Sequence, residues 1–274
     1  MIQPTPRFVI TVDYWHTKIS NYILPSAPNY ADVAAYYNNG TTSFADGTTI
    51  LKAAADPKNP NALPTILALL GSYSNAQSEV GSGIDVTATL RLPIGNNGVN
   101  LVSQFNASYL AKLEQTEANG GVQTYAGLLS PCNISSCSGA PKWRGSWQNT
   151  LDFKGKASMT LTAYYTSGYG LTATDFGGVP GQCDANTATG VPTAFLDGAT
   201  PIACKAHATF DLDWTGSVKV QQNFTLYVNV LNVLNNRPPF DPSAQYGLTG
   251  GFNAAWGNAN FIGRYFKVGA KIDF

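Results

Sequence analysis

Long apolar runs and charged residues are both scarce in this sequence, and each shortage excludes a class of protein. The longest apolar stretch, from Leu63 to Leu70, is far shorter than the roughly 18 residues of a membrane-spanning helix. Asp, Glu, Lys and Arg make up 12% of the 274 residues, about half the share usual in soluble domains. Because 16 basic residues balance 16 acidic ones, no basic field predicts nucleic acid as a partner.

The start of the sequence has no export signal. Residues 1–7 read Met-Ile-Gln-Pro-Thr-Pro-Arg and lead directly into a strand pattern, without a basic segment followed by an apolar one. Either the protein is not exported, or its true N-terminus is missing. The rest of the sequence favours the second interpretation.

Alternation of apolar and polar residues is the main signal that is present. In the segment 209–218, Phe210 and Trp214 share one predicted face, while Asp211 and Asp213 share the other. Segments with this pattern are about ten residues long, which is the length that a tilted strand needs to cross a bilayer. Eight such strands are predicted, at 8–14, 84–92, 99–109, 143–153, 157–165, 209–218, 224–230 and 266–274.

The connections between these strands are alternately short and long. The short ones are polar turns at 92–99, 153–157 and 218–224. The long ones run over 17–79, 115–142, 166–206 and 234–260. This alternation is typical of an antiparallel transmembrane β-barrel, with short periplasmic turns and long external loops. A soluble β-sandwich is the alternative, but its polar face would carry more Lys and Glu than the Thr, Ser, Asn and Asp seen here.

The last eight residues resemble the C-terminal signal of outer-membrane barrels, which the barrel-assembly machinery reads. The resemblance lies in Lys267, Gly269, Ile272 and Phe274. It agrees with a lipid-facing stripe in this strand, formed by Phe266, Val268, Ala270, Ile272 and Phe274. The alternative is an ordinary amphipathic edge strand that happens to end the chain.

Several loose motifs, in their order along the chain, resemble the C-terminal part of a TonB-dependent receptor. Residues 229–236 resemble the family's penultimate strand with its Asn-Leu-x-Asn ending, and Gly263 to Phe266, with Val268 and Gly269, resembles its last strand. Further matches are the segment 82–86 with the turn at 93–95, the segment 141–144, and the segment 8–14.

The resemblance implies a barrel of about 22 strands closed by an N-terminal plug domain. Residues 1–274 would then be one partial barrel domain, the last eight strands, in the outer membrane of a bacterium and surrounded by its lipid. The plug and the TonB box would be absent, so that the TonB complex would act only through the missing plug. The intact parent would import a bulky solute such as an iron chelate, a vitamin or an oligosaccharide.

A complete small eight-stranded barrel with a structural or adhesive role is the alternative function. Eight strands can close around an interior filled by side chains. Closure would require a hydrogen-bonded ladder between 8–14 and 266–274, whereas a receptor fragment would be an open, curved sheet. Inward charges of both signs could pair in a closed interior: Asp13, Asp85, Arg91, Lys112, Arg144, Asp152, Asp211 and Asp213.

The four cysteines predict two disulfides. Cys132 and Cys137 lie in the second long connection, and Cys183 and Cys204 lie in the third. External loops are in an oxidising compartment, so we expect each pair to form a bridge within its loop. A zinc site is the alternative, but these spacings do not match zinc-binding motifs.

No catalytic constellation is found. The two histidines, His16 and His207, stand apart near predicted strand ends and are interpreted as polar rim residues rather than metal ligands. Asp211 and Asp213 could suggest acid–base chemistry, but polar side chains are the expected lining of a barrel lumen. The sequence therefore predicts no enzyme and no cofactor, and leaves the substrate-binding residues unknown. Loop aromatic residues could contact a ligand or pack the loops, namely Tyr30, Tyr36, Tyr37 and Trp256.

Overall fold

The fold is known from a computed structural model, which describes residues 1–25, 30–44, 47–116, 121–132, 137–174, 179–181, 183, 204–239 and 262–273. The main sheet contains β1 (Ile2–Thr5), β2 (Phe8–Pro25), β5 (Tyr73–Ile94), β6 (Val99–Thr116), β7 (Val122–Thr124), β8 (Trp143–Phe153), β9 (Ala157–Thr166), β12 (Thr209–Gln221), β13 (Phe224–Leu231) and β14 (Tyr265–Ile272). The connections add α1 (Tyr30–Asn39), β3 (Thr49–Lys52), β4 (Ile66–Leu70), β10 (Tyr169–Gly170) and β11 (Lys205–Ala206).

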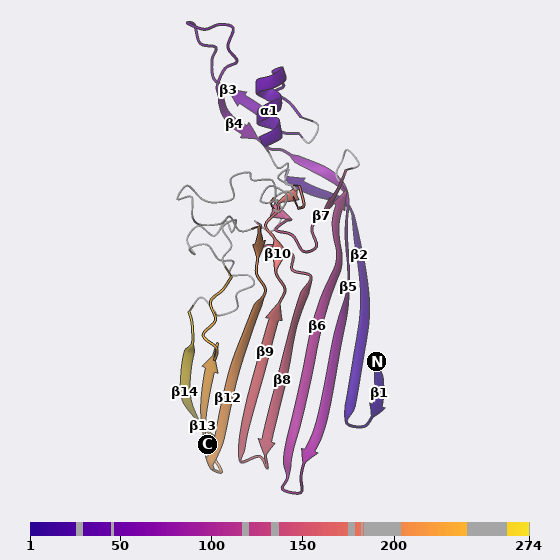
Figure 1. Cartoon of the computed structure of the whole chain (residues 1–274), viewed down its shortest axis with the longest axis vertical. Coiled ribbons are helices and arrows are strands. Elements are labelled where there is room, and N and C mark those ends of the chain that lie inside the picture. The colour runs from indigo at the N-terminus through magenta and orange to yellow at the C-terminus, as the bar shows by residue number, and fades with distance from the viewer. Residues whose placement is uncertain are drawn as a thin grey trace.

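The strands form one antiparallel sheet that does not close. Its order is β1-β2-β5-β6-β8-β9-β12-β13-β14, with β7 added to β6 (Figure 1). All eight predicted strands are present, and the prediction for β8 matches its bounds at both ends. In the part of the chain that the structure describes, no ladder joins β14 to β2. The open sheet expected of a receptor fragment is therefore confirmed, and the self-closed barrel lacks the ladder that it requires.

Alternation along the strands gives the sheet one apolar and one polar face, as predicted. Trp147 is 53% exposed and Phe210 is 47% exposed, whereas the neighbouring Asp211 is 3% exposed. Large exposed apolar side chains are tolerated only where something other than water covers them. The predicted outward positions Trp143 and Phe153 are also exposed. Trp214 lies on the outward face of Phe210, four residues along the same strand, and its ring packs against Gly216. Phe274 lies outside the described residues.

The short turns have the backbone geometry that hairpins require. Between β8 and β9, Lys154 and Gly155 both have positive φ, at 57° and 68°. Two central residues in this region form the tight turn whose twist matches the paired strands. Asp152 also accepts a hydrogen bond from the Gly155 amide at 3.1 Å. The predicted turn at 153–157 is confirmed.

The first long connection is shorter than predicted, because β2 and β5 continue far beyond the neighbouring strands. Their pairing runs up to Pro25 and Tyr73, so the connection covers 26–72 instead of 17–79. Outside a membrane, a ribbon needs its backbone hydrogen bonds but not the alternation that a lipid-facing strand shows. Residues 1–7 likewise contain a strand, β1, where only a lead-in was expected.

A small module tops the long β2–β5 ribbon (Figure 1). It consists of α1 and the hairpin β3–β4. Tyr36 is fully buried in it and donates a hydrogen bond to the Pro64 carbonyl at 2.6 Å. Tyr36 therefore packs the loop, whereas Tyr37 is 51% exposed. No helix in the described part of the chain is both long and apolar enough to span a membrane.

Candidate functional site

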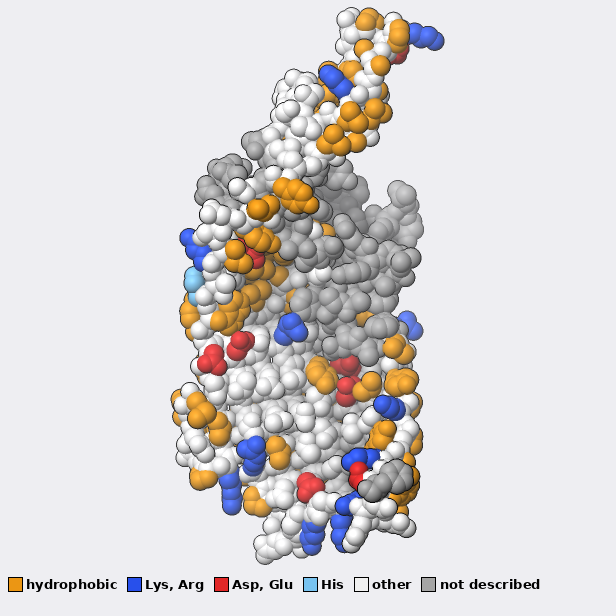
Figure 2. Space-filling model, turned by 180° about the vertical axis from the view of Figure 1, so that it is seen from behind, with side chains coloured by type: hydrophobic (Ala, Val, Ile, Leu, Met, Phe, Trp, Pro, Cys, Tyr) orange, Lys and Arg blue, Asp and Glu red, His pale blue; other side chains and the backbone are white. Residues whose placement is uncertain are grey.

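The concave face of the sheet is polar and is the first candidate for ligand contact. Hydroxyl groups meet across neighbouring strands, since Thr150 and Thr160 are 2.9 Å apart and Ser158 and Ser217 are 2.8 Å apart. Figure 2 shows this face as mainly uncharged, with a few acidic and basic side chains. A surface of this kind suits the wet lumen of a large barrel.

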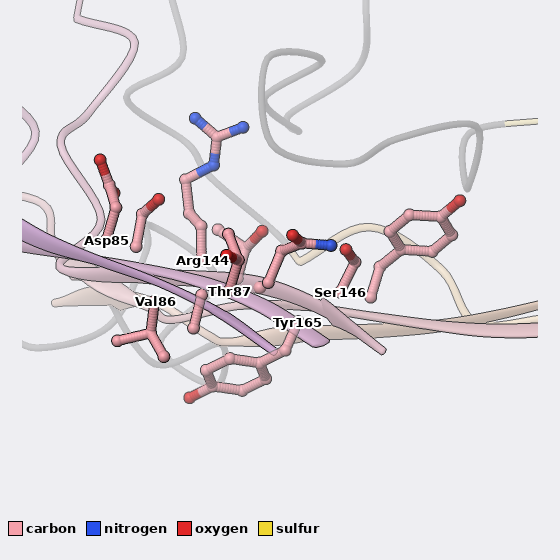
Figure 3. Close-up of a pocket in the computed structure, with 12 residues that line it drawn as sticks. Asp85, Val86, Thr87, Arg144, Ser146 and Tyr165 are labelled. Carbon is pink, nitrogen blue, oxygen red and sulfur yellow. The ribbon is translucent and has the colours of Figure 1, made fainter. Parts of the chain in front are cut away.

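A groove of about 640 Å³ lies on this face, across β5, β6, β8 and β9. In Figure 3, Asp85, Arg144 and Ser146 stand on one side of the sheet, while Val86 and Tyr165 point to the other. Alternation therefore sends the charged and hydroxyl-bearing side chains of these strands into the groove and leaves the apolar ones for lipid.

Register places Arg144 at the centre of the groove. It faces Ser108 on β6, and Ser108 in turn faces Asp85 on β5. Two strand spacings, about 10 Å, separate the backbones of Asp85 and Arg144. A solute in this space could meet the guanidinium at the centre of the groove and a carboxylate at its β5 end. Lys112, one of the charges that could pair inside a closed barrel, instead forms an ion pair with Glu114 of its own strand at 2.7 Å.

Two carboxylates face each other beside the groove. Asp13 on β2 is directly opposite Asp85 on β5, and strand parity places both side chains on the concave face. Like charges in directly opposed positions destabilise a sheet by a few tenths of a kcal/mol, or about 1 kcal/mol at most. This end of the groove is therefore the acidic one.

Asp211 and Asp213 each accept a hydrogen bond from a backbone amide of the sheet. Asp213 accepts a hydrogen bond from the Asn232 amide at 2.8 Å, which ties β12 to the end of β13. Asp211 accepts one from the Leu212 amide at 2.8 Å. Both carboxylates lie opposite the face of Phe210, as predicted.

Asn232 is the centre of a buried polar network that sequence reasoning did not assign. Its side chain is fully buried, donates to the Asn236 carbonyl at 2.8 Å and accepts from the Asn236 amide at 2.9 Å. The Asn236 side chain donates to the Phe210 carbonyl at 2.7 Å, and Asn235 accepts from the Arg264 amide at 3.0 Å. The Asn-rich motif at 229–236 thus joins the outer ends of β12, β13 and β14.

The second and third connections share a small hydrophobic core above the sheet. Leu129, Tyr169 and Ala206 are buried there together with the Cys132–Cys137 disulfide. Both predicted bridges are present in the structure, with Cα separations of 3.9 Å for Cys132–Cys137 and 5.6 Å for the pair 183–204. The connections are therefore folded against each other at the rim.

Four aromatic side chains form a row just below this rim, on the lipid-facing side. Tyr109 and Trp143 pair across β6 and β8, with ring centroids 4.5 Å apart. Tyr165 and Phe210 pair across β9 and β12 and are 46% and 47% exposed. Outer-membrane barrels carry such belts at the membrane interface. We expect the external boundary of the bilayer at the level of this outer aromatic row.

The two histidines do not come together. His16 lies within β2 and His207 just before β12, with four strands of the sheet between them. Both are exposed. Among the described residues, no cluster of His, Cys, Asp and Glu could hold a metal ion. Trp256 and the side chain of Tyr30 lie outside what the structure describes.

Comparison with known proteins identifies the fold. No family model and no curated protein matches the sequence, but the fold is similar to that of solved receptors and transporters. A mutant of the ferric enterobactin receptor PfeA from Pseudomonas aeruginosa is 14% identical with a TM-score of 0.51, over 98% of this chain and 29% of the receptor. The outer membrane transporter YddB from Escherichia coli is 12% identical with a TM-score of 0.52, over 99% of this chain and 31% of the transporter.

The siderophore receptor PirA from Acinetobacter baumannii is similar to the same degree, at 10% identity and a TM-score of 0.50, over 98% of this chain and 30% of the receptor. The chain thus spans about 30% of the length of the structures that it matches. It has the fold of a partial outer-membrane receptor barrel, as the resemblance to TonB-dependent receptors implies. The exposed apolar face and the outer aromatic row agree with strands of this fold that face lipid.

Proposed function

We propose that this chain is the C-terminal part of the barrel of a TonB-dependent receptor, which imports a bulky polar solute. The open sheet carries the proposal. In lipid, every backbone donor and acceptor at a sheet edge must be paired. The edge of β14, and the edge of β2 beyond its short pairing with β1, have no partner in the described part of the chain. Further strands that complete a larger barrel would satisfy both edges. The barrel-assembly machinery would then read β14, with Lys267, Gly269 and Ile272, as the end of the barrel.

The polar side chains of the concave groove support an oxygen-rich solute, whose anionic groups would lie at Arg144 and away from the acidic end formed by Asp13 and Asp85. Arg144 supplies a guanidinium for carboxylate or catecholate oxygens, and Ser108 and Ser146 supply hydroxyl groups beside it. Iron chelates have these features, and two of the similar structures are named as receptors for siderophores or ferric enterobactin. Uptake would require a plug domain and the TonB complex of the inner membrane.

An uptake assay with the complete reading frame tests this proposal. Cells that express it should accumulate a radiolabelled ferric chelate, and deletion of the inner-membrane TonB complex should abolish accumulation. Arg144→Gln should lower uptake about tenfold or more, because one charge-assisted hydrogen bond contributes roughly 1.5 to 3 kcal/mol. The matched control is Lys156→Gln, in the turn region at the opposite end of the sheet. Uptake that is independent of TonB, or a frame that encodes only eight strands closing on themselves, would overturn the proposal.

A further inference from the structure

The charged side chains on the concave face are divided by level along the strands. On the sheet in Figure 2, the acidic side chains lie mainly at mid-height and the basic ones mainly below them. Around Arg144, the outer half carries most of the strand carboxylates: Asp13, Asp85, Asp211 and Asp213. The inner half, toward the short turns, carries most of the strand bases of this face: Arg91, Lys219, Lys267 and Lys271.

These bases face the lumen and not the lipid. Lys219 shares the parity of Ser217, whose hydroxyl meets that of Ser158 at 2.8 Å on the concave face. Arg91 shares the parity of Asp85 on β5. The chain neighbours of Lys219 and Lys267 are apolar and exposed on the opposite side of the sheet: Val218, Val220, Phe266 and Val268. Alternation therefore directs both lysines inward.

Register joins the two sides of this inner half in one row. The row runs across seven strands from Arg91 on β5 to Lys267 on β14, and hydroxyl groups lie between them: Thr150, Thr160 and Thr215. Lys271 is paired with Asp273 at 2.8 Å. Among the described residues, Arg91, Lys219 and Lys267 have no ion-pair partner. We call the surface around these three residues the basic wall.

The basic wall is far enough from the carboxylates to keep a field of its own. Six residues separate Asp85 from Arg91 on β5, and six separate Asp213 from Lys219 on β12. This is about 20 Å along a strand, twice the roughly 10 Å over which salt at 0.1 M screens a charge. The fields of the two halves therefore do not cancel, and the lumen wall changes from negative to positive toward the short turns.

An anionic group that leaves Arg144 toward the short turns meets the basic wall next. We propose that the basic wall is a second binding surface for the anionic groups of the imported solute. Its cations attract such a group, and the threonine hydroxyls between them donate hydrogen bonds to it. The identity of the occupant rests on the proposed function, whereas the charge and the anion binding of the wall are measured without it.

Two thiol reagents of opposite charge measure the field on each half. They are an anionic sulfonatoethyl and a cationic trimethylammonioethyl methanethiosulfonate. The complete receptor carries either Thr215→Cys, in the basic row, or Thr87→Cys, two residues from Asp85. The four cysteines of this chain are paired in disulfides, so an introduced thiol is the only one among them that reacts. Dividing the anionic by the cationic rate cancels the reactivity of the thiol itself.

The rate ratio should be about tenfold higher at position 215 than at position 87 in dilute buffer. The difference should nearly vanish in 1 M salt, where the screening length is about 3 Å. At constant ionic strength, millimolar citrate, a small trianion, should slow the anionic reagent at position 215 by competition and leave position 87 unaffected. These comparisons require no change to a charged residue.

Paired lysine variants assign the field to the basic wall. Lys219→Gln together with Lys267→Gln should lower the ratio at position 215 about threefold to fivefold, because both charges lie within about 15 Å of it. The matched control is Lys18→Gln together with Lys58→Gln, which removes the same charge from exposed residues on β2 and in the loop between β3 and β4. This control should leave the ratio unchanged.

Four outcomes would overturn the proposal. Equal ratios at positions 215 and 87 would mean that the wall has no field of its own, and equal effects of the two double variants would mean that only net charge acts. Equal slowing by citrate at both positions would show that the wall binds no anion. A thiol at position 215 that neither reagent modifies would show that another part of the receptor covers the wall. Uptake is not measured here, so the receptor proposal and this one can fail separately.

Discussion

Replacing Asn232 should be among the most damaging single changes in the C-terminal strands. Asn232→Ala removes two hydrogen bonds to the Asn236 backbone, at about 1 kcal/mol each. It also leaves the amide and carbonyl of Asn236 short of a partner, and places alanine at a φ of +50°, which costs roughly another 1 kcal/mol. We expect the free energy of unfolding to fall by about 3 to 4 kcal/mol in total.

Glycine at the same position separates the two contributions. Asn232→Gly loses the hydrogen bonds but tolerates the positive φ, so it should cost about 2 kcal/mol. Asn100→Ala, at an exposed position of β6, is the matched control and should cost less than about 0.5 kcal/mol. Urea unfolding of the protein in lipid vesicles, followed by tryptophan fluorescence, measures all three. If alanine and glycine prove equally costly, the backbone part of this reasoning is wrong; if both cost less than the control, the network is not structural.

Three further predictions follow from contacts described for the sheet and its loops. Gly269 lies beneath the ring of Tyr227, with the Tyr227 Cε1 2.9 Å from where a Cβ would stand; Gly269→Val should therefore lower the yield of assembled barrel, and adding Tyr227→Ala should restore it. Reduction of the disulfides should loosen the loop closed by the pair 183–204 more than the loop closed by the pair 132–137. Chain entropy predicts that the two bridges stabilise the fold by about 3 and about 2 kcal/mol, for separations of 21 and 5 residues. Protease cleavage rates of the two loops before and after reduction measure this difference, and equal rates would contradict it. The 274-residue chain expressed alone should aggregate or be degraded through its free edges; a soluble, monodisperse product would contradict that expectation.

Most of the fold could be predicted because a lipid-facing strand constrains every second residue. The pattern of Phe210, Asp211 and Asp213 fixes which face each side chain takes, and a shift of one residue would exchange the faces. The end of β8 at Phe153 was likewise predictable, since a turn with Lys154 and Gly155 follows it directly. Above the lipid, a strand no longer needs alternating apolar and polar residues. The sequence therefore predicts loops for the upper parts of β2 and β5, which the structure shows as paired strands.

The sites were less predictable, because they depend on pairing between distant segments. The sequence marks Arg144 only as one lumen charge among several, and the register with Ser108 and Asp85 places it at the centre of a groove. The motif containing Asn232 was noticed as a resemblance, but its hydrogen bonds depend on how the chain turns after β13.

The long β2–β5 ribbon determines what an outside agent meets first. In register, Tyr14 lies level with Trp143 of the outer aromatic row, and β2 continues for eleven residues to Pro25. At about 3.3 Å per residue and a tilt near 40°, this raises the α1 module roughly 25 Å or more above the bilayer boundary. Antibodies and bacteriophages would reach this module before any other described part of the chain. An epitope tag inserted at its exposed tip, in the segment 56–62, should be displayed on intact cells while the barrel beneath stays undisturbed.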